Sequence, residues 1–432
     1  MKPFLLVFTT FFGLLSVFGQ QSSFSGYSTN TNNSESIVEF QLGEYSLQPI
    51  VSNGIEYSIP QSAKAARLLQ KGAPDLIQFS SSVQIPDAGN IRLEVLDVQY
   101  EEIPNVRIAP SYGNIMRSEN PAQIARIEGL QYSQNAFFPA EPATAGTPYI
   151  FRNTRGIAIH VYPMQYNPVT NILRVNHSIR VRVISESGAL GINERNPQRA
   201  SKATFGDKEL YQRHFLNSTP SRYDAPESQG KMLVISHDAF SAAMEPFVAW
   251  KKQCGIPTEL VNFSDLGGTT EITNRIRDEY YANNLRYVVL VGDIDQIPSP
   301  VRSGGKSDPS YGYVDGDDAY PEVQIGRFSA ETIADVQTQV QRVINYEQAT
   351  SGNHFSRVIG IGSQEGPGDD GEMDFEHIRN MHADLLDYSY TNAAEFFEGS
   401  QGGNDASGDP SAEELAAEIN AGAGLILYTG HG

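Results

Sequence analysis

Residues 231–293 read KMLVISHDAFSAAMEPFVAWKKQCGIPTELVNFSDLGGTTEITNRIRDEYYANNLRYVVLVGD. Short apolar runs occupy 231–236, 258–263 and 285–293, and the stretches at 238–254 and 270–282 between them have helical spacing. Continuous Val, Ile and Leu runs that alternate with amphipathic helices are typical of a mostly parallel sheet with helices on both faces. This segment therefore predicts an α/β domain.

The same alternation continues toward the C-terminus. A helix is predicted at 331–347 after VQIGRFSA, and buried strands are predicted at RVIGIGS (357–363) and GLILYTGHG (424–432). Ligands of parallel sheets bind at the carboxyl ends of strands. The strings VLVGD, GIGSQE and LYTGHG each change there from apolar to polar, so we expect the functional groups at these ends.

The region before this domain has a different pattern. Residues 34–186 hold short apolar runs with period-two alternation, such as IRLEVLDVQY (91–100) and LRVNHSIRVRVISE (173–186), which predict an all-β sandwich. Residues 187–230 are polar and irregular, as in an exposed linker open to proteolysis.

The N-terminus is typical of a secretory signal peptide. Lys2 precedes an apolar run from Phe4 to Phe18, and cleavage is expected after Gly19. No later segment has the roughly 18 uninterrupted apolar residues of a membrane span. We therefore expect a mature protein without a transmembrane segment, secreted to the extracellular space or the outer surface of a bacterium. The expected organisation is a signal peptide (1–19), a β-rich domain (20–186), a linker (187–230) and an α/β domain (231–432).

Charge and cysteine content restrict the function. Acidic residues outnumber basic ones by 51 to 31, and this net charge of −20 disfavours nucleic acid as a partner and suits calcium. Cys254 is the single cysteine, so no internal disulfide can form. It lies at the carboxyl end of a predicted helix, where the dipole disfavours a thiolate, so we expect a buried core residue and not a nucleophile.

The most informative residues are the last five, YTGHG. His431 lies just beyond a buried strand and is flanked by Gly430 and Gly432. His431 there can serve as a general base, and the N–H of the next residue can approach a substrate oxygen. Taken alone, the same pattern also fits a structural loop histidine.

Residues 231–432 contain six strings in a characteristic order: KMLVIS, FVAWKKQCGIPTEL, YVVLVGDIDQIP, KSDPSYGYVDGDDAYPEVQIGRFSA, SQEGPGDDGEMD and LYTGHG. In this order and at this spacing, the strings resemble the arginine-type gingipains of the C25 cysteine peptidases. The strings APSYGNIMR and VYPMQYNP in residues 100–186 are similar to the gingipain propeptide. The resemblance implies a β-sandwich prodomain followed by a caspase-like catalytic domain.

The resemblance also implies roles for single residues. His431 looks like the catalytic histidine, Gly432 offers an oxyanion-hole N–H, and Glu365 orients the imidazole. Asp374 is similar to the aspartate that pairs with the guanidinium of an arginine substrate. The family's nucleophilic cysteine follows the histidine beyond Gly432, so we expect the chain as given to be inactive. Without the family match, the acidic residues at 365–374 fit an ordinary solvated loop.

Gingipains bind calcium at positions that match an acidic group of this chain. The resemblance implies side-chain ligands from Asp293, Asp318 and Glu322 and carbonyl ligands from Asp315 and Tyr320. Outside the family context, VDGDDAYPE fits a surface turn. Glu372 is a candidate for a second ion site.

The resemblance to gingipains also implies that arginine residues take part in activation of the enzyme and in its inhibition by the prodomain. Arg222–Tyr223 resembles the junction at which gingipains are cut, and the prodomain is expected to inhibit the enzyme. Arg117 is the candidate to occupy the arginine pocket, with Arg107 and Arg126 as rivals. Partners are then peptide substrates, the chain's own prodomain and a secretion machinery that recognises a further C-terminal region.

Two other functions stay open from the sequence. One is a noncatalytic calcium-binding adhesion or secretion module with the same fold. The other is a metal-dependent hydrolase that uses Asp293 and Asp318 with His431, although the chain has no H-E-x-x-H motif.

Overall fold

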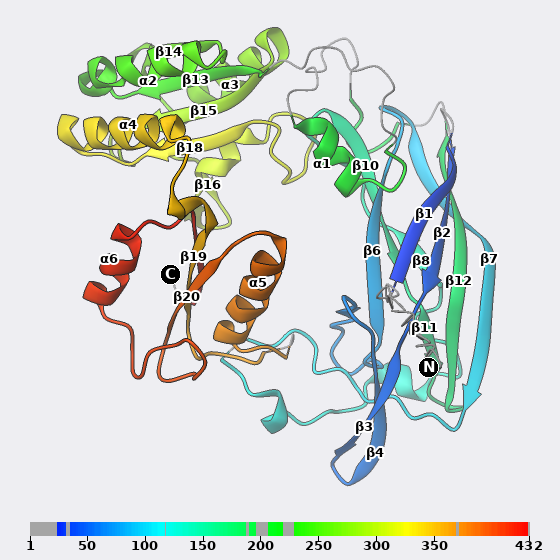
Figure 1. Cartoon of the computed structure of the whole chain (residues 1–432). Helices are drawn as coiled ribbons and strands as arrows, with labels where there is room; N and C mark the ends of the chain where they lie inside the picture. The colour runs from blue at the N-terminus through cyan, green and yellow to red at the C-terminus, as the bar shows by residue number, and fades with distance from the viewer. Residues whose placement is uncertain are drawn as a thin grey trace, which may run out of the picture.

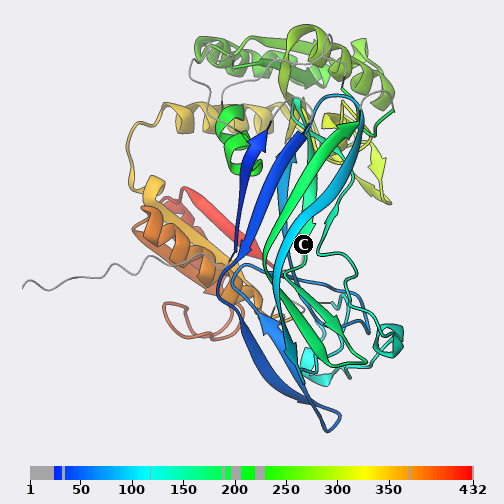
Figure 2. The same cartoon turned by 90° about the vertical axis from the view of Figure 1, so that its right-hand side faces the viewer.

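The computed structural model describes residues 24–31, 35–116, 118–186, 190–195, 206–218, 229–368 and 371–430. A strand-rich part and an α/β part lie side by side (Figure 1). Figure 2 shows the strand-rich part in front of the α/β part, with one long hairpin extending from its end. In the part of the chain described, no helix is both long and apolar enough to span a bilayer.

The strand-rich part contains two antiparallel sheets that pack on each other, which confirms the predicted sandwich. On β12, Ile179, Val181 and Val183 are buried between the sheets while Arg180 is exposed, because successive side chains of a strand point to opposite faces. The first sheet contains β1 (Phe24–Thr31), β2 (Glu35–Leu42), β12 (Ile172–Glu186), β11 (Met164–Asn167) and β7 (Asn90–Pro104). The second contains β5 (Ala66–Arg67), β6 (Ile77–Gln84), β10 (Thr154–Val161), β8 (Ala143–Ala145) and β9 (Tyr149–Phe151). The extending hairpin is β3 (Ser46–Ser52) with β4 (Ile55–Gln61).

Part of the expected irregular linker is ordered on the sandwich. Helix α1 (Asp207–His214) is followed by Phe215, which is 2% exposed and stacks against Tyr149. Asn217 accepts a 2.7 Å hydrogen bond from the N–H of Gln84. The linker prediction is therefore wrong for residues 207–217: the aromatic side chains of this short segment find a buried site on the sandwich that no local periodicity indicates.

The α/β part begins with a parallel sheet in the order β14-β13-β15-β18. Helices α2 and α4 cover one face through Met244, Phe247 and Val336, and α3 covers the other through Ile272 and Ile276. The strands are β13 (Lys231–Ser236), β14 (Thr258–Asn262), β15 (Leu285–Val291) and β18 (Gln324–Phe328). The helices are α2 (Ser241–Gln253), α3 (Thr269–Asn283) and α4 (Ile333–Gln348).

A second parallel sheet, β20-β19-β21, follows α4, so the described residues of the α/β part form two parallel sheets where the sequence predicted one. Its strands are β19 (Arg357–Gly362), β20 (Asn392–Phe397) and β21 (Leu425–Thr429), and its helices are α5 (Asp374–Tyr388) and α6 (Ala412–Asn420). An apolar run predicts a strand but does not determine which strands lie next to it in a sheet. Strand β20 is absent from the sequence prediction because its sequence, NAAEFF, has a weak apolar pattern.

The prediction that Cys254 belongs to the core is wrong, because the residue is exposed. Its N–H donates to the carbonyl of Trp250 at the last turn of α2, and Gly255 with φ +85° then reverses the chain. At the end of a helix the backbone departs from helical geometry, so a side chain there can be exposed even where the helical spacing predicts that it is buried.

Candidate active site

The carboxyl ends of β19 and β21 share one edge of the second sheet. Gly362 pairs with Thr429 in parallel register, and the N–H of Ser363 donates to the carbonyl of Thr429 at 3.0 Å. Glu365 follows Ser363 by two residues after β19, and Gly430 directly follows Thr429 after β21. His431 and Gly432 themselves lie outside the described residues.

Asp374 is held in a buried position at this edge. It is the first residue of α5 and is 2% exposed. The hydroxyl of Ser363 donates to Asp374 Oδ2 at 2.6 Å, and the N–H of Asp374 donates to the carbonyl of Glu365 at 2.9 Å. The Glu365 N–H donates in turn to Ser363 Oγ at 3.1 Å. The helix dipole favours a carboxylate at this end of α5, so the site can hold a negative charge for a cationic ligand.

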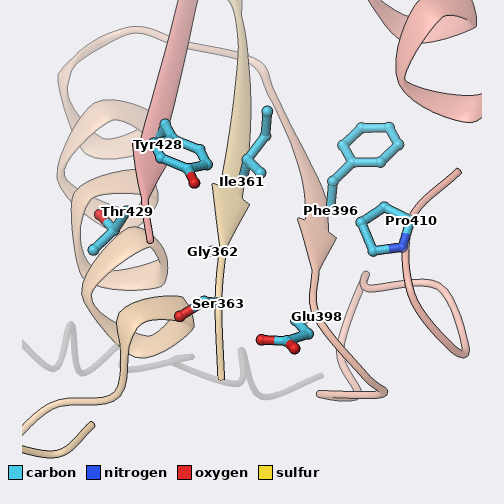
Figure 3. Close-up of a pocket in the computed structure, with 8 residues that line it drawn as sticks. All are labelled: Ile361, Gly362, Ser363, Phe396, Glu398, Pro410, Tyr428 and Thr429. Atoms are coloured by element: carbon cyan, nitrogen blue, oxygen red, sulfur yellow. The ribbon is translucent and has the colours of Figure 1, made fainter. Parts of the chain in front are cut away.

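A pocket of about 250 Å³ opens beside Ser363 (Figure 3). The side chains drawn around it come from the ends of all three strands and from the loop before α6: Ile361, Gly362, Ser363, Phe396, Glu398, Pro410, Tyr428 and Thr429. Glu398 Oε2 also accepts a hydrogen bond of 3.1 Å from the N–H of Gln364. The sequence prediction missed Glu398, although EFFEG changes from apolar to polar at a strand end as GIGSQE does.

Glu372 lies two residues before the first residue of α5. Its Oε2 is 2.9 Å from His377 Nδ1, and its Oε1 accepts a hydrogen bond of 3.1 Å from the side-chain amide of Asn380. The ion site proposed for this residue stays a prediction.

The acidic group of residues 315–322 lies away from this edge, before β18. Glu322 is 1% exposed, and its Oε2 accepts hydrogen bonds of 3.0 Å from the N–H groups of Val314 and Asp315. Burial raises the pKa of Glu322 to about 8 and also raises the pKa values of Asp315 and Asp318. Glu322 Oε1 is buried with no hydrogen-bond partner among the described residues, as a ligand oxygen for a cation would be.

Other members of the predicted calcium set lie differently. Asp293 Oδ1 accepts hydrogen bonds from the N–H of Ile294 at 2.8 Å and from Ser329 Oγ at 3.1 Å, while Tyr320 stacks on Tyr149 of the sandwich. Within the described ranges, no three His, Cys, Asp or Glu side chains are arranged to hold one metal ion. The buried carboxylates of the 315–322 loop fit a hard cation, and the complete ligand set stays a prediction.

The arginines proposed to inhibit the enzyme differ in their burial and in their ion-pair partners. Arg126 is buried, pairs with Asp75 at 2.7 Å and lies over the ring of Tyr112. Arg107 pairs with Glu128 at 2.8 Å. Both rivals thus pair with carboxylates of the strand-rich part, Arg126 in a buried position and Arg107 on the surface. Arg117, Arg222 and Tyr223 lie outside the described residues.

Two family models together match most of the sequence. "Propeptide_C25" matches residues 28–205, and "Peptidase family C25" matches residues 225–432. The chain belongs to peptidase family C25. The strand-rich part corresponds to the propeptide model and the α/β part to the peptidase model.

Relatives of this C25 chain include Gingipain R1 of Porphyromonas gingivalis, with 36% identity over 93% of the chain and 40% of the relative. Gingipain R2 of the same species is 34% identical over 92% of the chain and 54% of the relative. A solved complex of P. gingivalis RgpB pro- and mature domains matches 45% of the chain and 98% of the solved chain, with 31% identity and a TM-score of 0.41. The C25 chain spans about half or less of the length of these curated relatives.

Proposed function

We propose that the chain is the front part of a secreted cysteine endopeptidase zymogen that cleaves peptide bonds after arginine. The observation that carries the proposal is that the buried carboxylate of Asp374 lies at the sheet edge where β21 ends. Thr429 and Gly430 stand at this edge, and His431 is the next residue in the sequence. The 36% identity to Gingipain R1 supports arginine as the preferred residue.

In the proposed reaction, a thiolate supplied by the protein beyond Gly432 attacks the peptide carbonyl. His431 accepts the thiol proton and then donates a proton to the leaving amine, and Glu365 orients the imidazole. The N–H of Gly432 helps to stabilise the oxyanion. The pairing of β19 with β21 supports this assignment, because the segments that contain Glu365 and His431 follow directly from the adjacent ends of these two strands.

The arginine side chain of the substrate is proposed to reach Asp374. A guanidinium presents parallel N–H donors that match a carboxylate, so a bidentate pair discriminates arginine from neutral residues. The hydrogen bond from Ser363 fixes one oxygen of Asp374 and thereby the direction of the carboxylate.

The sandwich is proposed to act as the inhibitory prodomain. Arg117 is the proposed occupant of the arginine pocket, because Arg107 and Arg126 are held by Glu128 and Asp75. Cleavage at Arg222–Tyr223 would separate the two parts, and the signal peptide would export the protein out of a bacterial cell. A calcium ion on the carboxylates of the 315–322 loop would stabilise the catalytic part, because it would favour the ionised carboxylates that burial disfavours.

The test uses a chain extended through the residues that follow Gly432 in its natural protein. The purified protein should cleave Arg-Xaa peptides and lose this activity on thiol alkylation and on His431→Ala. Asp374→Asn should lower kcat/KM for arginine substrates by at least about a hundredfold, since a desolvated charge pair is lost. Unchanged arginine preference in Asp374→Asn would remove the specificity assignment, and activity without His431 would remove the mechanism.

A further inference from the structure

His382, in the middle of α5, is a buried histidine that takes no part in the proposed reaction. It is 3% exposed, and neither Nδ1 nor Nε2 of its ring has a hydrogen-bond partner among the described residues. A neutral imidazole has one donor and one acceptor, whereas an imidazolium has two donors and a positive charge. Burial without acceptors costs the charged form more free energy than the neutral form. The surroundings of His382 therefore favour the neutral ring.

The ring lies directly on the backbone of β19, beside which α5 runs in Figure 1. A Cβ atom placed on Gly360 would lie 2.5 Å from both Cε1 and Nε2 of His382 and would also meet Ile378. Only a residue without a side chain leaves room for this contact. Two residues further along the strand, a Cβ atom on Gly362 would lie 2.8 Å from the Cα of Phe375. Helix α5 therefore rests on two glycines of β19.

The same packing fixes the start of the helix, where Asp374 lies. Phe375 directly follows Asp374, and its N–H donates to the carbonyl of Ser363 at 3.2 Å. The helix is uninterrupted from Asp374 to Tyr388, and His382 lies about 12 Å along its axis from Asp374. Because a helix moves as a rigid element, displacement of His382 from Gly360 also displaces Asp374.

Among the described residues, the charged groups that face the ring are Arg379 of α5 itself and Glu395 of β20. They form an ion pair, with Arg379 Nη2 2.8 Å from Glu395 Oε2. The other two strands contribute uncharged residues, because Gly360 of β19 pairs in register with Leu427 of β21. Burial lowers the pKa of His382, Glu395 opposes this shift, and Arg379 adds to it. Protonation of the ring thus adds a buried charge that the Arg379–Glu395 pair does not neutralise.

We propose that neutral His382 is a positioning residue for Asp374, and that its protonation releases α5 from β19 and weakens arginine recognition. The role given to Asp374 rests on the proposed function, whereas the release of α5 does not. In the released state the ring binds a proton at the ordinary histidine pKa of about 6.5, and in the packed state it binds one less readily. The packed state therefore loses stability as pH falls below that value. Arginine recognition is then strong near neutral pH and weak in a mildly acidic medium.

The first experiment follows α5 in the chain as given and needs no peptidase activity. Hydrogen exchange of residues 374–388 is measured by mass spectrometry at pH 7.5 and 5.5 and corrected for the intrinsic exchange rate. Protection should fall about tenfold, the change that one proton bound at a pKa of about 6.5 in the released state permits. His382→Leu, which does not titrate, should show no such fall. His377→Gln replaces a half-exposed histidine of the same helix and should behave like the natural chain.

The second experiment measures arginine recognition in the extended enzyme. The readout is the ratio of kcat/KM for an arginine peptide to kcat/KM for the same peptide with neutral citrulline. This ratio cancels the titration of His431, which acts on both substrates. It should fall between pH 7.5 and 5.5 in the natural chain and in His377→Gln, and fall less in His382→Leu. His382→Met, whose flexible side chain adapts to the same space, is a second variant in case the leucine variant does not fold.

The outcomes separate the two parts of the proposal. An equal loss of protection in the natural chain and in the His382 variants would overturn the release of α5. Release of α5 with an unchanged arginine-to-citrulline ratio would overturn the positioning of Asp374. Absence of arginine preference at pH 7.5 would overturn the proposed function and with it the role of Asp374, and the exchange experiment distinguishes this result from a failure of the contact between His382 and Gly360.

Discussion

The hydroxyl of Ser363 donates a 2.6 Å hydrogen bond to Oδ2 of the buried carboxylate of Asp374. The same hydroxyl accepts a hydrogen bond from the N–H of Glu365, so one small side chain links the proposed specificity residue to the proposed orienting acid. Ser363 thereby connects two groups that the sequence presents as separate acidic residues.

Replacement of Ser363 by alanine should weaken arginine recognition without unfolding the protein. We expect kcat/KM for arginine substrates of the extended enzyme to fall about tenfold, because a hydrogen bond to a charged group contributes about 1.5–3 kcal/mol. Ser363→Thr, which keeps the hydroxyl, should recover part of the loss. Equal losses in the alanine and threonine variants would show that space at this position matters and not the hydrogen bond.

Calcium should stabilise the catalytic part through the buried carboxylates of the 315–322 loop. At a calcium concentration a hundred times Kd, the free energy of unfolding should rise by about 2.7 kcal/mol. Calorimetric titration and melting curves with calcium and with chelator measure the effect. Glu322→Gln should abolish it, and Glu413→Gln, at an exposed position of α6, serves as the control. An undiminished calcium response in Glu322→Gln would remove Glu322 from the ligand set.

The buried ion pair between Asp207 and Arg286 should be costly to break. Asp207→Ala leaves the guanidinium buried without its carboxylate, so we expect a loss of about 3–5 kcal/mol in the free energy of unfolding, measured with chemical denaturant. The double variant Asp207→Ala, Arg286→Met should recover much of it. A loss below about 1 kcal/mol in the single variant would mean that the pair is open to solvent.

Acidification should destabilise the aromatic contact at α1. Burial lowers the pKa of His214, whose Nε2 lies 2.7 Å from the hydroxyl of Tyr149 and whose ring stacks on Phe151. The unfolded state therefore binds more protons below the ordinary histidine pKa of about 6.5, and stability falls as pH decreases below that value. Melting temperatures between pH 7.5 and 5 should fall more steeply for the natural chain than for His214→Gln. Parallel curves would exclude His214 as the source.

Sequence periodicity determined the secondary structure and the class of each part. The runs at 231–236 and 357–363 became strands with nearly the expected bounds, and the alternation in 173–186 became a strand of the sandwich. These patterns are local, because each buried face follows from side chains spaced along a single element. Asp374 and the 315–322 loop were singled out by the family resemblance and not by periodicity, because acidic strings of this kind also fit solvated loops.

Only the tertiary structure decided which distant groups meet. The division into two sheets, the burial of Phe215 on the sandwich and the exposure of Cys254 depend on packing between elements far apart in the sequence. The contacts of Asp318 with Ile150 and Asn193 join residues more than a hundred positions apart. Such pairings are selected by the shape and charge of whole surfaces, and no pattern within one element carries that information.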